Sequence, residues 1–250
     1  MLGFEVSAYL VGDLLVDTGF RHVRRQMLDV LSDSTIAAIC CTHNHEDHTG
    51  NCAPLVDRHR CPAYLRNCEL RWGEGVRRLK PYRSWFWGPP GELEVQEMPE
   101  VVEGAERRLR AIPAPGHSAT HVALWEEASG TVFTGDLFIS PGASAVMTQE
   151  NPYELAASLR RVAAVQPELM LTGHGQVLAK PAVALRTKAE RIEAAASRAV
   201  ELHRSGMADR DAVREIFATG HGRDRMIEVL TQGEFSRANF VRAAVLHAPV

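Results

Sequence analysis

The sequence predicts an α/β fold in which two β-sheets pack face to face with helices on their outer sides, an αββα sandwich followed by a C-terminal helical extension. Three observations predict it. Both halves of the first 180 residues begin with short apolar runs of strand length and end in a helical pattern. Hydrophobic residues make up 45% of the 250 residues, enough for a sizeable core. After Pro181 only helical spacing occurs. We therefore expect a sandwich domain over 1–180 and a helical extension over 181–250.

The first elements are a strand pair, a helix and a buried strand. Residues 4–18 alternate as two strands that turn at Gly12-Asp13, and a helix is expected over 21–31. Residues 36–41 form an apolar run with the length and composition of a buried strand. The polar segment that follows, 42–50, is interpreted as a loop, and a second helix should begin near Asn51.

The middle of the chain combines an irregular stretch with several strands. Residues 72–91 contain three of the four tryptophans among basic residues, glycines and prolines, and we interpret them as a long surface loop. Four strands should follow, at about 93–98, 107–113, 121–126 and 131–139.

The last third is mainly helical. Asn151 can cap a helix whose first position is Pro152, and a strand over 168–172 precedes a long helix that begins after Pro181 and stops near Gly206. Two or three shorter helices should occupy 209–247. The apolar stripe of the long helix suits docking on the sandwich and a homodimer contact equally well.

Charge and cysteine content exclude several classes of protein. The formal net charge of -3 argues against bulk nucleic-acid binding. Five cysteines with no C-x-x-C pair do not describe a disulfide scaffold, so a reducing cytosol is expected. The N-terminus lacks the basic region of a signal peptide, and no apolar run approaches the roughly 20 residues that span a bilayer. We expect a cytoplasmic protein without a membrane partner.

Five of the eleven histidines lie in three short, glycine-flanked segments. Each segment follows an apolar run, as does a further Gly-Asp pair, so each candidate side chain lies where a strand ends in a loop. A lone loop histidine is more often a surface or capping residue, but this combination favours metal binding. The candidate ligands are His43, His45, Asp47, His48, His117, Asp136 and His174.

These residue types match the chemistry of divalent zinc, which binds imidazole nitrogen and carboxylate oxygen. One ion would take nitrogens from His43, His45 and His117. A second ion would take Asp47, His48 and His174, and Asp136 could bridge the two. A hydroxide between them would be the nucleophile, because metal binding lowers the pKa of water to about 7. We expect two Zn²⁺ ions per chain, with Fe or Mn as alternatives because the same ligands accept them.

In order and spacing, this ligand set resembles the metallo-β-lactamase superfamily over about residues 6–180, and the segment Leu15 to Gly19 resembles its first conserved turn. The resemblance implies an αββα sandwich with an active dinuclear site at one edge between the sheets. Asp17 would orient the loop that carries the histidines, or be a plain turn aspartate. His121 would contact the substrate or support a ligand, or simply pack in a strand.

Individual branches of the superfamily match less well. Antibiotic-degrading enzymes lack the bridging aspartate that Asp136 provides. Glyoxalase II enzymes carry a Lys and a Tyr about ten residues beyond that aspartate, where this chain has residues 144–147. Acyl-homoserine lactonases place a Tyr at the position of Ile139. The overall layout is similar to the branch that includes small endoribonucleases.

We therefore predict hydrolysis of an ester, thioester or lactone of a small-molecule substrate, with Asp47 helping to pass a proton to the leaving group. One alternative is an endoribonuclease or phosphodiesterase on the same metals, which the basic and aromatic residues of 77–87 would favour. Another is a mononuclear-iron persulfide dioxygenase, which would use only His43, His117 and Asp136.

Overall fold

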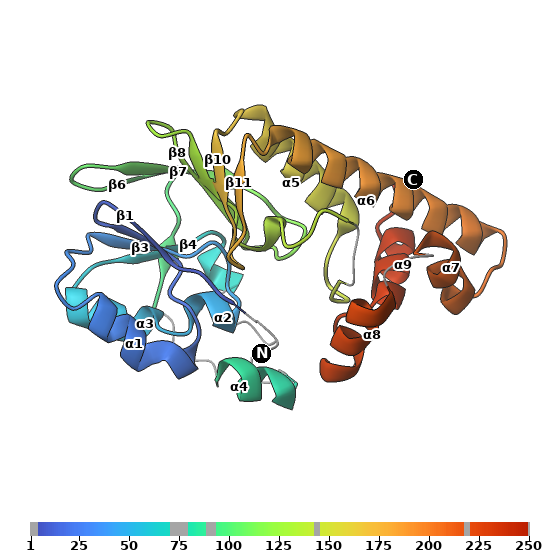
Figure 1. The fold of residues 1–250 in the computed structure, drawn as a ribbon, viewed down its shortest axis with the longest axis horizontal. Helices are drawn as coiled ribbons and strands as arrows, with labels where there is room; N and C mark the ends of the chain where they lie inside the picture. The colour runs from blue at the N-terminus through green and yellow to red at the C-terminus, as the bar shows by residue number, and fades with distance from the viewer. Residues whose placement is uncertain (1–4, 71–79, 89–93, 143–145, 218–220, 250) are drawn as a thin grey trace. The chain divides into compact units, whose positions relative to one another are not determined.

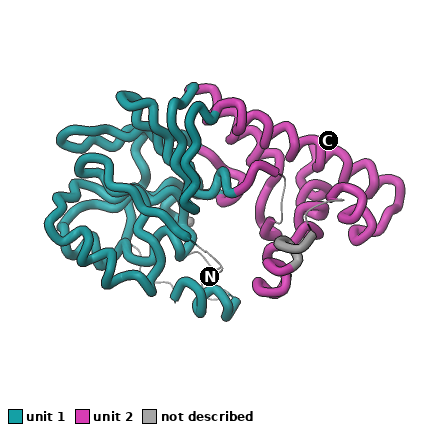
Figure 2. The backbone as a smooth tube through the Cα atoms, viewed as in Figure 1, with its two compact units in different colours: residues 1–113, 119–139, 166–181 teal, residues 114–118, 140–165, 182–250 magenta. Residues whose placement is uncertain are grey.

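In the computed structural model the described residues are 5–70, 80–88, 94–142, 146–217 and 221–249. The chain groups into two compact units (Figure 2). The first contains residues 1–113, 119–139 and 166–181, and the second contains residues 114–118, 140–165 and 182–250.

The first unit contains a five-stranded sheet of order β1-β2-β3-β4-β5 (Figure 1). Its strands are β1 (Tyr9–Val11), β2 (Leu14–Val16), β3 (Ala38–Cys40), β4 (Ala63–Leu65) and β5 (Gln96–Glu97). Only β1 and β2 pair in antiparallel fashion; the other neighbours are parallel. Gly12 has a φ of +62°, which glycine adopts readily, so the predicted turn between the first two strands is confirmed.

The helical elements beside this sheet include, among the described residues, α1 (Arg24–Val30), α3 (Cys52–His59) and two 3₁₀ turns (Arg21–Val23 and Cys68–Leu70). Leu15 and Ile39 point toward these helices and share a buried cluster with Leu31 and Leu55. The helix predicted over 21–31 and the one beginning near Asn51 are therefore both present.

A six-stranded sheet of order β11-β10-β9-β8-β7-β6 completes the first unit. Its strands are β6 (Val101–Glu103), β7 (Arg108–Pro113), β8 (Val122–Glu126), β9 (Thr131–Phe133), β10 (Leu169–Leu171) and β11 (Val177–Ala179). Only β9 and β10 are parallel, so their carboxyl ends meet at one edge. The edge strands β6 and β11 were not predicted, and β9 ends earlier than the predicted 139.

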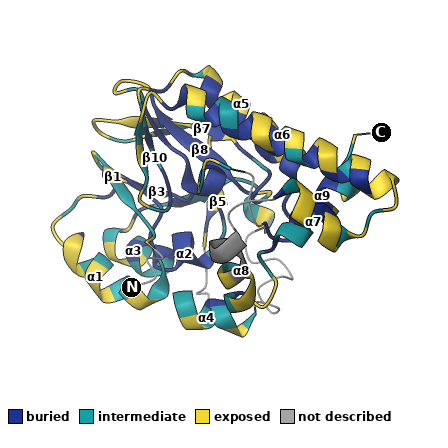
Figure 3. Cartoon of the chain, turned by 45° about the vertical axis from the view of Figure 1, so that its right-hand side comes forward, coloured by how far each residue is buried: buried dark blue, intermediate teal, exposed yellow. Residues whose placement is uncertain are grey.

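The main core of the first unit lies between the two sheets. Leu14, Val16 and Cys40 alternate with the helix-facing residues and pack with Leu124 and Phe133 of the second sheet. Figure 3 colours β3 and β8, the strands of Cys40 and Leu124, as buried. Strands covered on both faces read as continuous apolar runs, which is the pattern seen in the sequence. Two mixed sheets with helices confirm the predicted fold class.

The second unit is helical and contains α5 (Pro152–Ala164), α6 (Ala182–Arg204), α7 (Asp209–Ile216), α8 (His221–Leu230) and α9 (Arg237–Leu246). The Asn151 side chain accepts hydrogen bonds from the N–H groups of Tyr153 and Glu154, which confirms the predicted cap. Leu185, Ala189 and Ile192 form the buried stripe predicted for the long helix. Among the described residues, no helix is both long and apolar enough to cross a bilayer.

Two segments interpreted as loops contain helices, which corrects the prediction. The segment 42–50 includes α2 (Glu46–Thr49), whose Thr49 N–H donates to the carbonyl of His45. The stretch 72–91 includes α4 (Pro81–Trp87), in which Pro81 takes the first position. Both helices are too short to be stable on propensity alone. They also contain too few residues for an apolar periodicity to be recognised in the sequence. The other residues predicted to belong to that loop lie largely outside the described part of the chain.

Candidate metal centre

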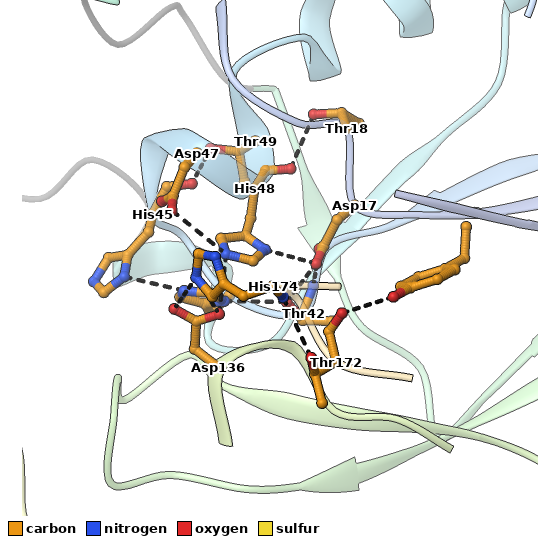
Figure 4. A network of polar contacts seen from close by, with 12 residues as sticks. Asp17, Thr18, Thr42, His45, Asp47, His48, Thr49, Asp136, Thr172 and His174 are labelled. Carbon is orange, nitrogen blue, oxygen red and sulfur yellow. Dashed lines mark hydrogen bonds and ion pairs between the residues drawn. The ribbon is translucent and has the colours of Figure 1, made fainter. Parts of the chain in front are cut away.

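Strand ends in the first unit bring the candidate ligands together. His43 follows β3 after two residues, and the helix α2 begins shortly afterwards. Asp136 lies in a 3₁₀ turn (Gly135–Leu137) just after β9, and His174 lies three residues after β10. Because β9 and β10 are parallel neighbours, Asp136 and His174 are presented at the same edge of their sheet. Residues 43–48, which carry four of the candidate ligands, are called the histidine segment below. Figure 4 shows the side chains of Asp136 and His174 beside those of this segment.

The ligand atoms form two groups. Those of His43, His45 and Asp136 lie within 4.8 Å of one another, and so do those of Asp47, His48 and His174. In the first group, Nε2 of His43 is 3.0 Å from Nδ1 of His45. The structure therefore brings six of the seven predicted ligands together within the first unit.

Asp136 connects the two groups. One of its carboxylate oxygens, Oδ1, lies 3.2 Å from Nε2 of His48 and also 3.2 Å from Nε2 of His174. The same carboxylate belongs to the group with His43 and His45. This is the position that the sequence suggested for a bridging ligand.

The buried surroundings fit a pair of cations. Nε2 of His48 is buried and makes no hydrogen bond of good geometry with the described residues, although such atoms are nearly always satisfied in proteins. A Cβ atom on Gly173 would approach Cε1 of His48 to 2.6 Å and Oδ1 of Asp136 to 2.7 Å, so no side chain fits there. Closely spaced nitrogen and oxygen donors suit Zn²⁺, Fe²⁺ or Mn²⁺.

Protonation follows the charges around each ligand. Burial, together with the neighbouring His48 and His45, holds the pKa of His43 well below its usual value, so this ring is neutral. Burial also acts to lower the pKa of His48, but Asp136, Asp47 and Asp17 outweigh it and raise that pKa well above its usual value.

His174 and Asp136 influence each other in the same way. Burial lowers the pKa of His174, but Asp136 outweighs it and raises that pKa to about 9. Burial raises the pKa of Asp136, but the adjacent His174 and His48 hold it well below its usual value. In the absence of a cation, the protons on the rings of His48 and His174 therefore balance the negative charge of the neighbouring carboxylates. Metal ions would take the place of those protons.

Asp17 holds the histidine segment in place. Its Oδ2 atom lies 2.8 Å from Nδ1 of His48 and accepts a hydrogen bond from the Thr42 hydroxyl at 2.8 Å, while Oδ1 accepts from the Thr42 N–H at 2.7 Å. Thr18 adds a bond from its N–H to the carbonyl of His48. Asp17 has a φ of +56°, an uncommon conformation outside glycine. Its contacts are those expected of a residue that orients the ligand loop.

His121 and the N-terminal segment support two further ligands. The buried Nε2 atom of His121 accepts a hydrogen bond from the N–H of Asp136 at 3.2 Å. Nδ1 of His174 donates to the carbonyl of Glu5 at 2.6 Å. The contact with Glu5 was not predicted, since a backbone carbonyl has no sequence signature.

His117 belongs to the second unit, in the segment 114–118. Its ring is buried, and Nδ1 lies 3.3 Å from Oε2 of Glu150. The other oxygen of Glu150 accepts from the N–H of Met147 at 2.8 Å, which fixes the carboxylate. Glu150 was not among the predicted residues. The assignment of His117 to the first ion stays a prediction from the sequence.

Comparison with known families and proteins gives consistent results. A sequence model of the metallo-beta-lactamase superfamily matches residues 2–174. A beta-lactamase-like protein 2 homolog of Caenorhabditis elegans is 28% identical over 187 residues, or 70% of this chain and 57% of that protein. A hydroxyacylglutathione hydrolase of Halorhodospira halophila is 30% identical over 138 residues, or 52% and 43%. An atrochrysone carboxyl ACP thioesterase of Aspergillus fumigatus is 28% identical over 180 residues, or 69% and 51%. The chain thus spans about half the length of these relatives.

Solved structures are similar as well. The protein TTHA1623, determined in a di-iron-bound form, is 31% identical with a TM-score of 0.60, covering 75% of this chain and 96% of that one. The metallo-beta-lactamase family protein TTHA1429 of Thermus thermophilus is 21% identical with a TM-score of 0.63, covering 97% and 87%. The second likeness concerns the fold alone, and it extends over the C-terminal helices.

Proposed function

The chain belongs to the metallo-beta-lactamase superfamily, and from this membership we propose that it hydrolyses an ester, thioester or lactone of a small molecule at a dinuclear metal site. The observation that carries the proposal is the pair of His/Asp groups joined at Asp136. A chain that had kept only the fold would have no reason to keep both groups of donors, most of them buried, with the donor atoms of each group within 4.8 Å of one another.

Thioesters are the substrates we favour within this class. Two of the relatives carry names that describe cleavage of acyl groups from thiols: a hydroxyacylglutathione hydrolase and an ACP thioesterase. Neither is matched over two thirds of its own length, so the choice of thioester is part of the proposal. Glutathione itself is a weaker candidate, because the Lys and Tyr expected for glutathione recognition do not occur in 144–147.

We assign the residues as follows. His43 and His45, with His117, would hold one cation, while Asp47, His48 and His174 would hold the other, and Asp136 would contribute to both. Bound there, two divalent cations supply Lewis acidity and a hydroxide nucleophile at neutral pH. Zn²⁺ is the expected metal, and iron is an alternative that the di-iron form of TTHA1623 supports.

The chain's own side chains prepare the site for this chemistry. The neutral ring of His43 is ready to bind without losing a proton, whereas His48 and His174 must release theirs on loading. Asp17 and His121 keep His48 and Asp136 oriented. Asp47, 6% exposed, carries the carboxylate that would pass a proton to the departing thiol or alcohol.

Nucleic-acid cleavage receives less support. Arg83 is one of the basic residues that would favour RNA binding, but its guanidinium is buried and paired with Glu46. It is therefore not available to bind a phosphate group.

The experiment is a substrate panel on purified protein of measured metal content: acyl thioesters, activated esters, lactones and short RNAs. We expect metal-dependent thioester hydrolysis that a chelator abolishes, and its loss in His43→Ala and His117→Ala but not in His203→Ala, an exposed residue of α6. A protein with two metals that cleaves only RNA, with a steep salt dependence, would replace this proposal by the ribonuclease alternative. One iron per chain with oxygen uptake would replace it by the dioxygenase.

A further inference from the structure

A buried ion pair joins α4 to the segment that carries the metal ligands. Glu46 is the residue between His45 and Asp47, and Arg83 lies on α4. Nε of Arg83 lies 2.5 Å from Oε1 of Glu46, and Nη2 lies 2.9 Å from Oε2. The two residues are 4% and 2% exposed. The guanidinium and the carboxylate therefore form a two-bond fork out of contact with water.

Stability alone is a poor reason for such a pair. Removing two charges from water is energetically unfavourable, and apolar residues of similar volume often replace a buried pair without loss of stability. What the fork provides is a fixed geometry, since both hydrogen bonds must align at once. The question is which part of the molecule needs that geometry.

The helix α2 needs it at one end. This four-residue helix is too short to be stable alone. Its C-terminal end is held by the segment after β2, in which Asp17 binds the ring of His48 and the N–H of Thr18 donates to the carbonyl of His48. At the other end, the side chain of His45 does not cap the helix but contacts His43. Glu46 is the first helical residue, and its fork to Arg83 holds this end.

The helix α4 is itself fixed to neighbouring parts of the first unit. The rings of Trp87 and Phe20 meet edge to face at 5.2 Å, and Nε2 of His22 donates to the carbonyl of Trp85 at 3.1 Å. Phe20 and His22 follow closely after the segment of Asp17 and Thr18 that holds His48. The helix α4 is thus attached to the histidine segment through Glu46, and through Phe20 and His22 to the segment that follows Asp17 and Thr18.

We propose that Arg83 is a positioning residue that acts through Glu46: it fixes the N-terminal end of α2 and thereby places the side chains of His45 and Asp47 for metal binding. The inference rests on the proposed metal-binding function. Arg83 would then be a determinant of metal affinity that lies 35 residues after His48, the last candidate ligand of the histidine segment.

The test compares a double variant with a matched control. Glu46→Leu/Arg83→Leu removes the fork without leaving a buried charge. Arg160→Leu/Glu193→Leu removes another two-bond Arg–Glu pair, between α5 and α6 in the second unit, in which both side chains are partly exposed. Circular dichroism and thermal unfolding establish folding, and competition with a chromophoric chelator gives the Zn²⁺ dissociation constants.

We expect the first double variant to bind Zn²⁺ about 10–100-fold more weakly than the wild type, the usual effect of removing a group that supports metal ligands. The control should bind like the wild type. The visible spectrum of the Co²⁺-loaded protein should change only in the first variant, because it reports ligand geometry. Arg83→Lys keeps the charge but not the fork and should recover only part of the affinity.

Unchanged Zn²⁺ affinity and Co²⁺ spectrum in a folded Glu46→Leu/Arg83→Leu protein would overturn the inference. If that variant does not fold, Arg83→Lys decides in the same titration, and wild-type affinity there overturns it equally. Failure of the proposed reaction looks different: the wild type would bind two ions tightly and hydrolyse none of the carbonyl substrates, while the variants could still differ in affinity.

Discussion

The ring of His48 and the carboxylate of Asp17 lie 2.8 Å apart, both almost fully buried, at the point where β2 ends. The same carboxylate accepts two hydrogen bonds from Thr42, the residue before His43. One side chain therefore orients one candidate ligand directly and holds the segment that presents another. A metal centre built in this way depends on residues that never touch the ions.

Asp17→Asn tests this dependence. In this variant an amide N–H would face the proton on Nδ1 of His48, where the carboxylate oxygen of Asp17 now accepts it. We therefore expect the metal affinity to fall about 10–100-fold while the fold is retained. Chelator competition measures the affinity, and Asp57→Asn on the exposed face of α3 is the control. Wild-type affinity in Asp17→Asn would show that this contact does not support the ligand.

Metal stoichiometry distinguishes the roles of Asp136 and His174. Asp136 lies next to both groups of donors, whereas His174 belongs to one. We expect Asp136→Ala to lose both ions and His174→Ala to retain about one per chain, each measured by elemental analysis after dialysis. If the two variants retained equal amounts of metal, Asp136 would not be the bridging ligand.

Space around the ligands can be tested at Gly173. An alanine there would bring its Cβ within 2.7 Å of both His48 and Asp136, although its backbone conformation is open to alanine. We expect Gly173→Ala to displace these ligands, lower the metal content, and destabilise the protein by about 1–3 kcal/mol, as overpacking does. Gly142→Ala should be neutral, because no atom of the described residues, apart from its own chain neighbours, lies within 4 Å of the added Cβ. Chemical unfolding and elemental analysis check both variants.

The metal-free protein should lose stability as the pH rises. The pKa of His174 is raised to about 9 from 6.5, so its contribution is complete below 6.5 and disappears as the pH passes through about 9. A shift of this size corresponds to about 3 kcal/mol. The raised pKa of His48 acts in the same direction. The lowered pKa of His43 has its effect below 6.5, outside this window.

Urea unfolding of chelator-treated protein between pH 6.5 and 9.5 measures this loss. His174→Gln should have a flatter profile, and so should the metal-loaded wild type, in which cations replace the protons. A metal-free wild type whose stability is constant or increases over this range would contradict the prediction.

Local patterns were enough for much of the fold. The turn at Gly12, the buried strand β3 and the cap at Asn151 were all predicted, because turn conformation, apolar run length and capping depend on neighbouring residues. The short edge strands β6 and β11 were missed, since three residues carry too little periodicity. The helices α2 and α4 were missed for a related reason: each depends on a partner far along the chain, as Glu46 depends on Arg83.

The same division holds at the metal centre. Residue types and their places after strands were enough to name the candidate ligands, because donor chemistry is a property of single side chains and parallel strand ends meet at a common edge. The sequence named Asp17 and His121 as possible supports, but the groups that they contact are given only by the folded chain, in which His121 accepts a hydrogen bond from the N–H of Asp136. The contact of the Glu5 carbonyl with His174, 169 residues away, had no sequence signature at all. Contacts between distant segments depend on how sheets and loops pack, and no local pattern of residues records that packing.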